Sequence, residues 1–365
     1  MHMADALLSP AVGGVAWAAS GTAVVYSARK VREDLDESKI PLMGVAGAFV
    51  FAAQMLNFSI PGTGSSGHLV GALLLAILLG PQAAFLVIAS ILAVQALFFA
   101  DGGLLALGAN IINMGFFTAF VAYPLVYRRI VGDGPALQRT RVVVGSVLAA
   151  VVGLQLGAFA VVLETTASGI SELPFSTFVL LMQPIHLAIG VVEGLVTAAV
   201  VLFVYRAEPE LLARTTGEAR RAGLRLKPVV IGLVVAALIA GGVLSWFASS
   251  DADGLEWSIA KVTGTEEELE ADSATHEAAA GLQEKTAILP DYTFKEDASG
   301  ATGAGEPATG SEAAGVAEDD GAAWPAVDAG TTLSGIVGAL IVLAIAVGLG
   351  VVLRRRSVAR AKARA

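Results

Sequence analysis

The sequence has no cysteine and few charged residues. Without cysteine, the chain can form neither disulfides nor thiolate metal sites, so a bound metal must be held by nitrogen or oxygen ligands. Only 15% of the 365 residues are charged, whereas 55% are apolar, and the charges collect between long uncharged runs. Repeated apolar stretches of this kind have no purpose in a soluble chain, and they indicate a polytopic membrane protein.

Two further absences narrow the function. The chain contains no Gly-x-x-x-x-Gly-Lys-Ser/Thr phosphate-binding loop, so we expect no ATP to be bound or hydrolysed through that motif by this chain. It also lacks the basic footprint of a nucleic-acid-binding protein: the net charge is −9, and more than half of the acidic residues lie in the single segment 249–332. We therefore expect that the chain is not itself an ATPase and that it has no nucleic-acid partner.

Nine apolar segments predict an all-α fold, a polytopic transmembrane helical bundle. The segment 69–80 is too short to cross alone, and Pro81 separates it from the next run, so residues 69–100 could form a broken or re-entrant pair. The segment 176–205 is overlong, and we expect it to be tilted or kinked near Pro184. The nine predicted spans are 11–28, 41–57, 69–80, 83–100, 104–127, 141–163, 176–205, 229–248 and 333–353.

The basic residues predict the orientation, because Lys and Arg favour the cytoplasmic ends of membrane spans. With nine spans, the basic loops all fall inside only if the N-terminus is outside and the C-terminus inside. The segment 249–332 is then external, and its half 298–330, rich in Ala, Gly, Glu and Asp, is expected to be disordered. The basic loops are 29–39, 128–141, 206–227 and 354–364.

The four histidines are the most informative positions in the sequence. His2 stands next to the first residue, and His68 ends the glycine-rich external loop 61–67. His186 lies inside a predicted span. His276 lies in the acidic external segment, where we expect a solvated surface position.

His2 suggests a metal chelate. An N-terminal residue followed by histidine can bind a divalent metal through the terminal amine, the second backbone nitrogen and the imidazole. A fourth nitrogen would complete a square-planar set, which suits Ni(II) or Cu(II) and is possible for Co(II), and His68 lies on the same predicted face. The alternatives are a flexible tail for His2 and an interfacial helix start for His68. No Lys or Arg precedes the first apolar run, so we expect no cleaved signal peptide.

Polar residues also occur within or beside the spans. His186 and Glu193 are two helical turns apart and share one face of their helix. Ionisable groups at membrane depth are costly and usually functional, although this pair could equally join two helices. Asp101, Asn110 and Asn113 form a similar cluster after an apolar run, and we expect them to lie around a site or along a pathway.

Several stretches in the first 200 residues resemble one family, and they occur in the family's order. This family is the CbiM/NikM type, the membrane substrate-binding subunit of energy-coupling-factor (ECF) ABC transporters for cobalt and nickel. The matching stretches are Met1-His2-Met3-Ala4-Asp5 with Leu8-Ser9-Pro10, Ser66-Gly67-His68-Leu69-Val70-Gly71 within 64–80, Gln95 to Gly103, Gly108 to Gly115, and His186 to Gly194.

The rest of the chain resembles a second family module, named for a Pro-Asp-Gly-Leu-Glu motif and similar to the N subunit of the same transporters. Here the motif reads Ala252-Asp253-Gly254-Leu255-Glu256, so its proline is absent. The resemblance implies a fusion. Residues 1–227 would form the metal-binding domain with seven spans, and 228–365 an accessory hairpin with two spans and the external loop 249–332.

The resemblance also implies a ligand set and partners. The ligands would be the Met1 amine, the His2 backbone nitrogen and imidazole, and the His68 imidazole. The transported substrate would be Co²⁺ or Ni²⁺. The partners would be an ECF transmembrane coupling subunit and cytoplasmic ATPase subunits. The chain itself would be a multi-pass protein of the cytoplasmic membrane.

Two other functions fit parts of the sequence. Gly64-Ser65-Ser66-Gly67 fits Gly-x-Ser-Gly, so Ser66 and His186 could be the nucleophile and base of an intramembrane serine protease. A metal sensor or passive channel would share the metal site and need no ATPase partner.

Overall fold

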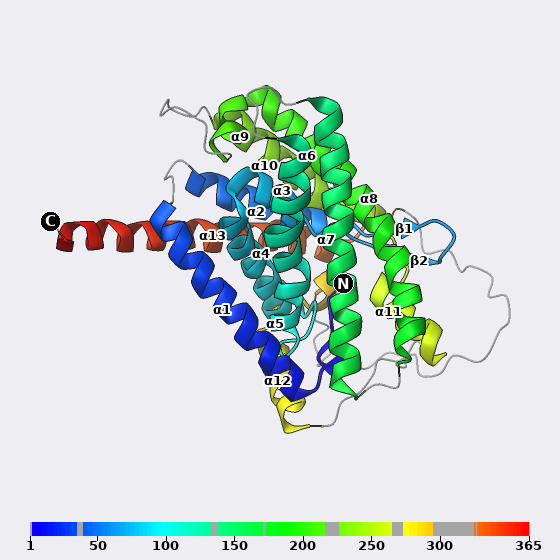
Figure 1. Ribbon diagram of the computed structural model, residues 1–365. Coiled ribbons are helices and arrows are strands. Elements are labelled where there is room, and N and C mark those ends of the chain that lie inside the picture. The colour runs from blue at the N-terminus through cyan, green and yellow to red at the C-terminus, as the bar shows by residue number, and fades with distance from the viewer. Residues whose placement is uncertain are drawn as a thin grey trace.

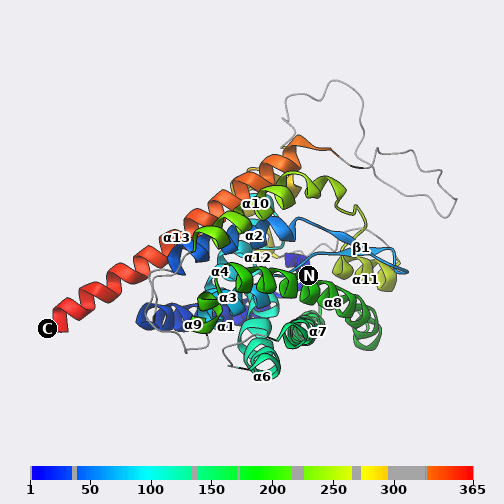
Figure 2. The same cartoon turned by 90° about the horizontal axis from the view of Figure 1, so that it is seen from above.

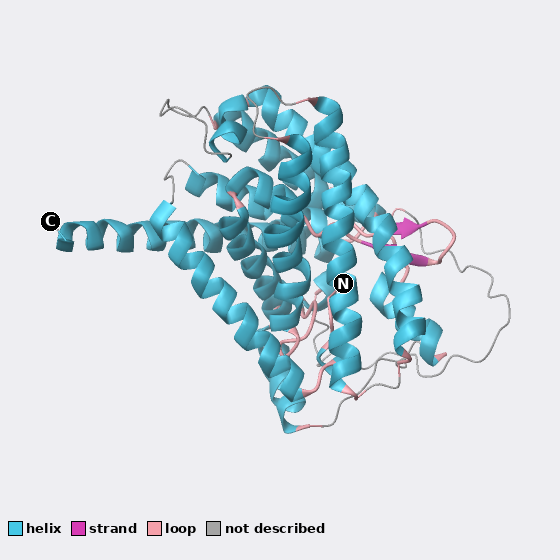
Figure 3. Ribbon diagram, viewed as in Figure 1, coloured by secondary structure: helices cyan, strands magenta, loops and turns pink. Residues whose placement is uncertain are grey.

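The computed structural model describes residues 2–34, 39–132, 138–170, 173–215, 226–264, 273–294, 325 and 327–364. These residues are mostly helical, as Figure 3 shows. The helices are α1 (Pro10–Asp34), α2 (Ile40–Gln54), α3 (Ala72–Leu79), α4 (Pro81–Val94), α5 (Leu107–Asn110), α6 (Arg128–Val131), α7 (Arg139–Ser168), α8 (Phe175–Ala207), α9 (Pro209–Thr215), α10 (Lys227–Gly242), α11 (Gly254–Thr263), α12 (Ala274–Thr286) and α13 (Ala329–Arg364).

Several short elements complete the fold. Two π-helical segments, Gln95–Phe99 and Ile111–Tyr127, continue α4 and α5. Strands β1 (Phe58–Ile60) and β2 (Ser65–Gly67) form an antiparallel hairpin in which Ser59 pairs with Ser66. The short 3₁₀ turns are Asp5–Leu7, Leu244–Phe247 and Pro290–Tyr292.

The chain is a multi-pass membrane protein. Among the described residues, α2 and α10 are apolar helices shorter than a full span, and α2 has 15 residues, a rise of about 22 Å against a hydrocarbon core of about 30 Å. The count of nine spans therefore stays a prediction for these two segments and for 69–80. Six described stretches are long and apolar enough to cross: Pro10–Glu33, Pro81–Phe99, Leu107–Val131, Arg139–Ser168, Phe175–Ala207 and Ala329–Arg355.

The short apolar segment forms a separate helix, as expected. All eight residues of α3 are buried, so neighbouring helices cover this short helix on every side. Gly80 ends it with a φ of 91°, which glycine adopts without strain, and Pro81 begins α4. The prediction of a broken pair at 69–100 is confirmed. α8 runs through Pro184 as one helix of 33 residues, and the tilt or kink expected there stays a prediction.

Glycines bring the helix backbones together. α7 packs along α8, where a Cβ at Gly194 would lie 2.3 Å from the Cα of Val147. The accessory helices α10 and α13 both pack on α2, and a Cβ at Gly338 of α13 would lie 2.1 Å from the ring of Phe51. Helix association in a membrane depends on such close packing, since lipid supplies no hydrophobic drive between apolar helices. Figure 2 shows α13 and α10 beside α2.

This packing places the accessory segment, by which we mean the described residues between α10 and α13, beside the amino terminus. In Figure 1, α6 and α9 lie at the top, whereas β1, β2 and α11 lie to the right and α12 at the bottom. The described residues between α10 and α13 thus lie near the first residues of the chain and the β1–β2 hairpin.

Candidate metal site

The amino-terminal hook, residues 2–8, is fixed inside the bundle by backbone hydrogen bonds. Met3 is fully buried, and its N–H donates to Asn110 Oδ1 at 2.8 Å. Its carbonyl accepts from Asn110 Nδ2 at 3.2 Å and from the Gly103 N–H at 2.9 Å. One asparagine side chain therefore pairs with both backbone groups of Met3, as a neighbouring strand would, and this places His2 next to it in the interior.

Asp5 ties the other end of the hook to the loop before α5. Its Oδ1 accepts from the Ala106 N–H at 2.9 Å. Only glycine fits at position 103, because a Cβ there would lie 1.8 Å from that carboxylate oxygen. Burial raises the pKa of Asp5, and the bond from Ala106 partly offsets this rise.

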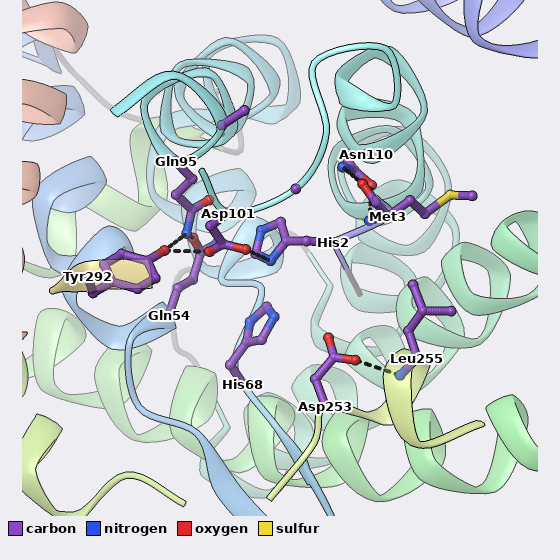
Figure 4. A network of polar contacts seen from close by, with 12 residues as sticks. His2, Met3, Gln54, His68, Gln95, Asp101, Asn110, Asp253, Leu255 and Tyr292 are labelled. Atoms are coloured by element: carbon purple, nitrogen blue, oxygen red, sulfur yellow. Dashed lines mark hydrogen bonds and ion pairs between the residues drawn. The ribbon is translucent and has the colours of Figure 1, made fainter. Parts of the chain in front are cut away.

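His2 and His68 come together, as the sequence predicted. Their rings stack with centroids 5.0 Å apart and planes 13° from parallel (Figure 4). His68 Nδ1 lies 3.0 Å from the Leu69 carbonyl, and as the donor of that bond it leaves the lone pair on Nε2. Burial lowers the pKa of His68 to about 3, so the ring is neutral at neutral pH. Met1 lies outside the described residues.

Asp101 faces His2 from the loop after α4. Its Oδ1 lies 3.0 Å from His2 Nδ1, and its Oδ2 accepts a short hydrogen bond from the Tyr292 hydroxyl. Burial raises the pKa of Asp101, but the charge of His2 and the bonds from His2 and Tyr292 outweigh burial and hold that pKa well below its usual range. His2 Nε2 is buried and makes no hydrogen bond to a described residue.

Glu193 of α8 supports the loop that carries His68. Its two carboxylate oxygens accept from the backbone N–H groups of Val70 at 2.7 Å and Gly71 at 3.1 Å. Gln54 of α2 completes this support by donating to the Val70 carbonyl at 2.8 Å. Gly71 has a φ of 74°, so the sharp turn after His68 needs glycine.

His186 and Glu193, the predicted polar pair in α8, do not bond to each other. His186 is fully buried, its Nδ1 lies 2.8 Å from the Met182 carbonyl, and its Nε2 bonds to no described residue. Glu193 bonds instead to the His68 loop. Asn113 lies beside the hook, where its Nδ2 donates to Glu164 at 2.6 Å and approaches the Met3 sulfur at 3.7 Å.

The prediction of a solvated His276 is wrong. His276 of α12 is 7% exposed, and its Nε2 lies 3.1 Å from the Asp5 carbonyl and 2.9 Å from the Leu8 carbonyl. Ser273 lies 2.6 Å from its Nδ1. The accessory segment folds back over the hook, and this buries the imidazole. A local acidic composition could not indicate that contact.

His276→Ala is expected to loosen the hook, because two backbone carbonyls lose their donor. Each lost hydrogen bond should cost about 1 kcal/mol. Amide hydrogen exchange over residues 3–8 should become faster, and metal affinity should fall without being abolished. Leu282→Ala on the exposed face of the same helix is the control. Unchanged exchange in His276→Ala would show that His276 does not hold the hook.

The Ala252–Glu256 motif builds the start of α11 beside His68. Asp253 caps the helix, and Glu256 completes a capping box by accepting from the Asp253 N–H at 3.2 Å. Gly254 lies against α8, where a Cβ would be 2.5 Å from Ile185. Asp253 and Gly254 line a small cavity together with Gly67, His68, Val70 and Ile189.

The geometry does not favour the protease hypothesis. The Ser66 hydroxyl is fully buried and donates to the Asp251 carbonyl at 2.7 Å. The His186 Nδ1 is engaged by its own helix. Both groups therefore make structural bonds, whereas a nucleophile and its base would bond to each other.

Both parts of the chain match known protein families. The family described as the cobalt uptake substrate-specific transmembrane region, CbiM, matches residues 2–211, and the PDGLE domain matches 227–355. A protein of Archaeoglobus fulgidus that carries the name NikMN is 32% identical over 354 residues, 96% of this chain and 98% of that protein. The fused nickel transport protein NikMN of Rhodobacter capsulatus is 35% identical over 251 residues, 64% of this chain and 71% of that one. A solved structure of a truncated transition metal transporter is 33% identical, with a TM-score of 0.50, over 57% of this chain and 99% of that one.

Proposed function

We propose that this chain, which belongs to the CbiM family of cobalt-uptake transmembrane regions and carries a PDGLE domain after it, captures Co²⁺ or Ni²⁺ for uptake across the cytoplasmic membrane. Relatives that share both parts bear the names of nickel transport proteins. The observation that carries the proposal is the stacked pair of His2 and His68, held inside the bundle by the hook and by the Glu193-supported loop.

The proposed ligands are the Met1 amine, the His2 backbone nitrogen and imidazole, and the His68 imidazole. Within the described residues, no group of three or more His, Asp or Glu side chains is arranged to hold a metal. Two imidazoles alone make a weak site, so main-chain nitrogens have to supply the rest. A chelate with its own backbone nitrogen uses His2 Nδ1, the atom that faces Asp101. Capture therefore replaces a proton on that nitrogen by the ion.

The chain is a transport protein, and we propose that other subunits supply its energy. The sequence has no Gly-x-x-x-x-Gly-Lys-Ser/Thr loop, so ATP hydrolysis through that motif would come from cytoplasmic ATPase subunits, joined through an ECF transmembrane coupling subunit. Metal uptake into cells should then require those subunits. Accumulation that survives their deletion would favour a passive channel.

The test of capture is metal retention by the purified chain with an untagged N-terminus. Co(II), Ni(II) and Zn(II) are each added to the wild type, His2→Ala and His68→Ala, and the bound ion is counted after gel filtration. We expect about one ion per chain, lost in both variants, since each supplies a ligand. Retention by both variants would contradict the proposed site and direct the search to His186 and Glu193.

A further inference from the structure

Tyr292 of the accessory segment lies beside the candidate metal site. Its ring stacks on the buried ring of Phe99, with centroids 5.0 Å apart and planes 18° from parallel. Its backbone carbonyl accepts from the Ser334 hydroxyl of α13 at 2.9 Å. The first domain therefore holds the ring and the last helix holds the backbone, so the hydroxyl stands where the two parts of the chain meet.

The turn that presents Tyr292 has a strained backbone. Asp291 and Tyr292 have φ of 50° and 62°, a left-handed conformation that residues other than glycine rarely adopt. The buried Leu289 anchors the start of this turn, where its N–H donates to the Phe98 carbonyl at 3.2 Å. Strain of this kind persists only where the surrounding structure enforces it. The packing around the turn thus keeps the hydroxyl directed into the polar interior.

One arm of hydrogen bonds leads from this hydroxyl to His2. The hydroxyl donates to Asp101 Oδ2, and Asp101 Oδ1 lies 3.0 Å from His2 Nδ1. Burial and the negative charge of Asp101 raise the pKa of Tyr292 well above its ordinary value, so the hydroxyl keeps its proton and remains the donor. The Asp101 backbone N–H donates to the Gln95 carbonyl at 3.1 Å. Asp101 is therefore fixed at its backbone and at Oδ2, which directs Oδ1 toward His2.

A second arm leads from the same hydroxyl to the loop that carries His68. Gln95 Nε2 donates to the Tyr292 hydroxyl at 3.4 Å and to Gln54 Oε1 at 2.9 Å. Gln54 Nε2 in turn donates to the carbonyl of Val70, two residues after His68, at 2.8 Å. Both glutamines are buried, where polar groups depend on partners within the protein. Figure 4 shows the hydroxyl of Tyr292 between these two arms.

We propose that Tyr292 is a positioning residue for metal capture, whose hydroxyl sets the imidazoles of His2 and His68 relative to each other before the ion arrives. This inference rests on the proposed function. Tyr292 does not bind the ion; it acts through Asp101 on one side and through the two glutamines on the other. Ligands that are already in place lose less conformational freedom on binding, and partners outside the ligand set change metal affinity for this reason. The accessory segment thereby takes part in capture.

The chain offers a matched set of variants. Tyr292→Phe removes one oxygen and keeps the ring that stacks on Phe99. Tyr26→Phe removes the same oxygen from a tyrosine of α1 that is 50% exposed, so it is the control. Tyr292→para-aminophenylalanine, introduced by stop-codon suppression, returns an N–H donor to the position of the hydroxyl. Rescue by this variant would assign the effect to the hydrogen bond and not to the ring.

The first measurement is a titration of Co(II) into the purified full-length proteins with an untagged N-terminus. Tyr292→Phe should lower the affinity about tenfold, because partners outside the ligand set are worth 10–100-fold. Tyr26→Phe should match the wild type, and Tyr292→para-aminophenylalanine should recover most of the loss. X-ray absorption of the bound Co(II) should show the same number of ligands in the wild type and in Tyr292→Phe, since the tyrosine does not bind the ion.

A double-mutant cycle tests the route through Asp101. In the Asp101→Ala background, Tyr292→Phe should lower Co(II) affinity much less than it does in the wild type, because the arm to His2 is already broken. Residues that act through one network show such coupling, whereas an independent effect on folding would add the same loss in both backgrounds.

Four results would overturn the positioning role of Tyr292: wild-type affinity in Tyr292→Phe, an equal loss in Tyr26→Phe, no rescue by para-aminophenylalanine, or additive losses in the cycle. A ligand lost from the X-ray absorption spectrum of Tyr292→Phe would also contradict it. His68→Ala separates this failure from failure of the proposed function. If His68→Ala abolishes binding while Tyr292→Phe has no effect, the capture site stands and only the positioning role is wrong. If His68→Ala binds as the wild type does, the capture site itself is wrong.

Discussion

Adding two residues before Met1 is expected to abolish high-affinity metal binding, because the proposed chelate includes the Met1 amine. The extension converts the amine of Met1 into an amide and removes one ligand of the fused chelate rings. We expect affinity to fall by more than about 100-fold, because loss of an outer-shell partner alone costs 10–100-fold. The measurement is a titration of Co(II) and Ni(II) into the purified chain.

The control for this prediction is the same two residues placed after Ala365, which should leave binding unchanged. An extension that ends in a protease site provides a second control, because cleavage that restores Met1 as the first residue should restore binding. Wild-type affinity in the uncleaved protein would contradict the chelate. The stacked imidazoles would then have to bind the ion with other ligands.

Glu193→Ala is expected to have the second largest effect. Glu193 is buried, and its carboxylate is the acceptor for two backbone N–H groups of the His68 loop, at Val70 and Gly71. Each buried donor left without a partner costs about 1–3 kcal/mol. The variant should therefore unfold at lower temperature and lose most of its metal affinity, although Glu193 is not among the proposed ligands.

Two further variants test the cause of this effect. They are Glu193→Gln and Glu164→Gln. Gln keeps the volume of Glu193 and one acceptor oxygen, so metal affinity and thermal stability should fall between those of the wild type and Glu193→Ala. Glu164→Gln removes an ionisable group from α7 without touching the His68 loop, so it should leave the loop in place. Metal affinity in Glu193→Ala equal to that of the wild type would show that the loop does not depend on this carboxylate.

The polar residues of the first domain were predicted from sequence because they are rare in long apolar runs. A group such as Glu193 or Asn110 is costly in a membrane, so its presence alone indicates a role. The structure gives these roles: Asn110 pairs with Met3, Asp101 faces His2, and Glu193 holds the His68 loop. The sequence also predicted that His2 and His68 lie on one face of the membrane, and their rings stack on each other.

The residues that the sequence reading missed lie mainly in the accessory segment. Tyr292 stands in a polar stretch that was predicted to be external and has no periodic pattern, yet its hydroxyl bonds to Asp101 and its ring stacks on Phe99. Its φ of 62° is unusual for a residue other than glycine, and such strain gathers at functional sites. Gln54 and Gln95, hydrogen-bonded at 2.9 Å inside the bundle, were the polar signals in apolar runs that could have been found.

The sequence by itself determined the class of protein. Apolar length, the distribution of Lys and Arg and the absence of cysteine are local or additive properties, so they indicate a multi-pass membrane protein with nitrogen or oxygen ligands without any knowledge of packing. Only the tertiary structure decided that the accessory segment closes over the amino-terminal hook. His276 reaches the Asp5 carbonyl across 271 positions, and Tyr292 reaches Asp101 across 191. Such contacts depend on how α10 and α13 pack against α2, because that packing fixes where the described residues between these two helices lie.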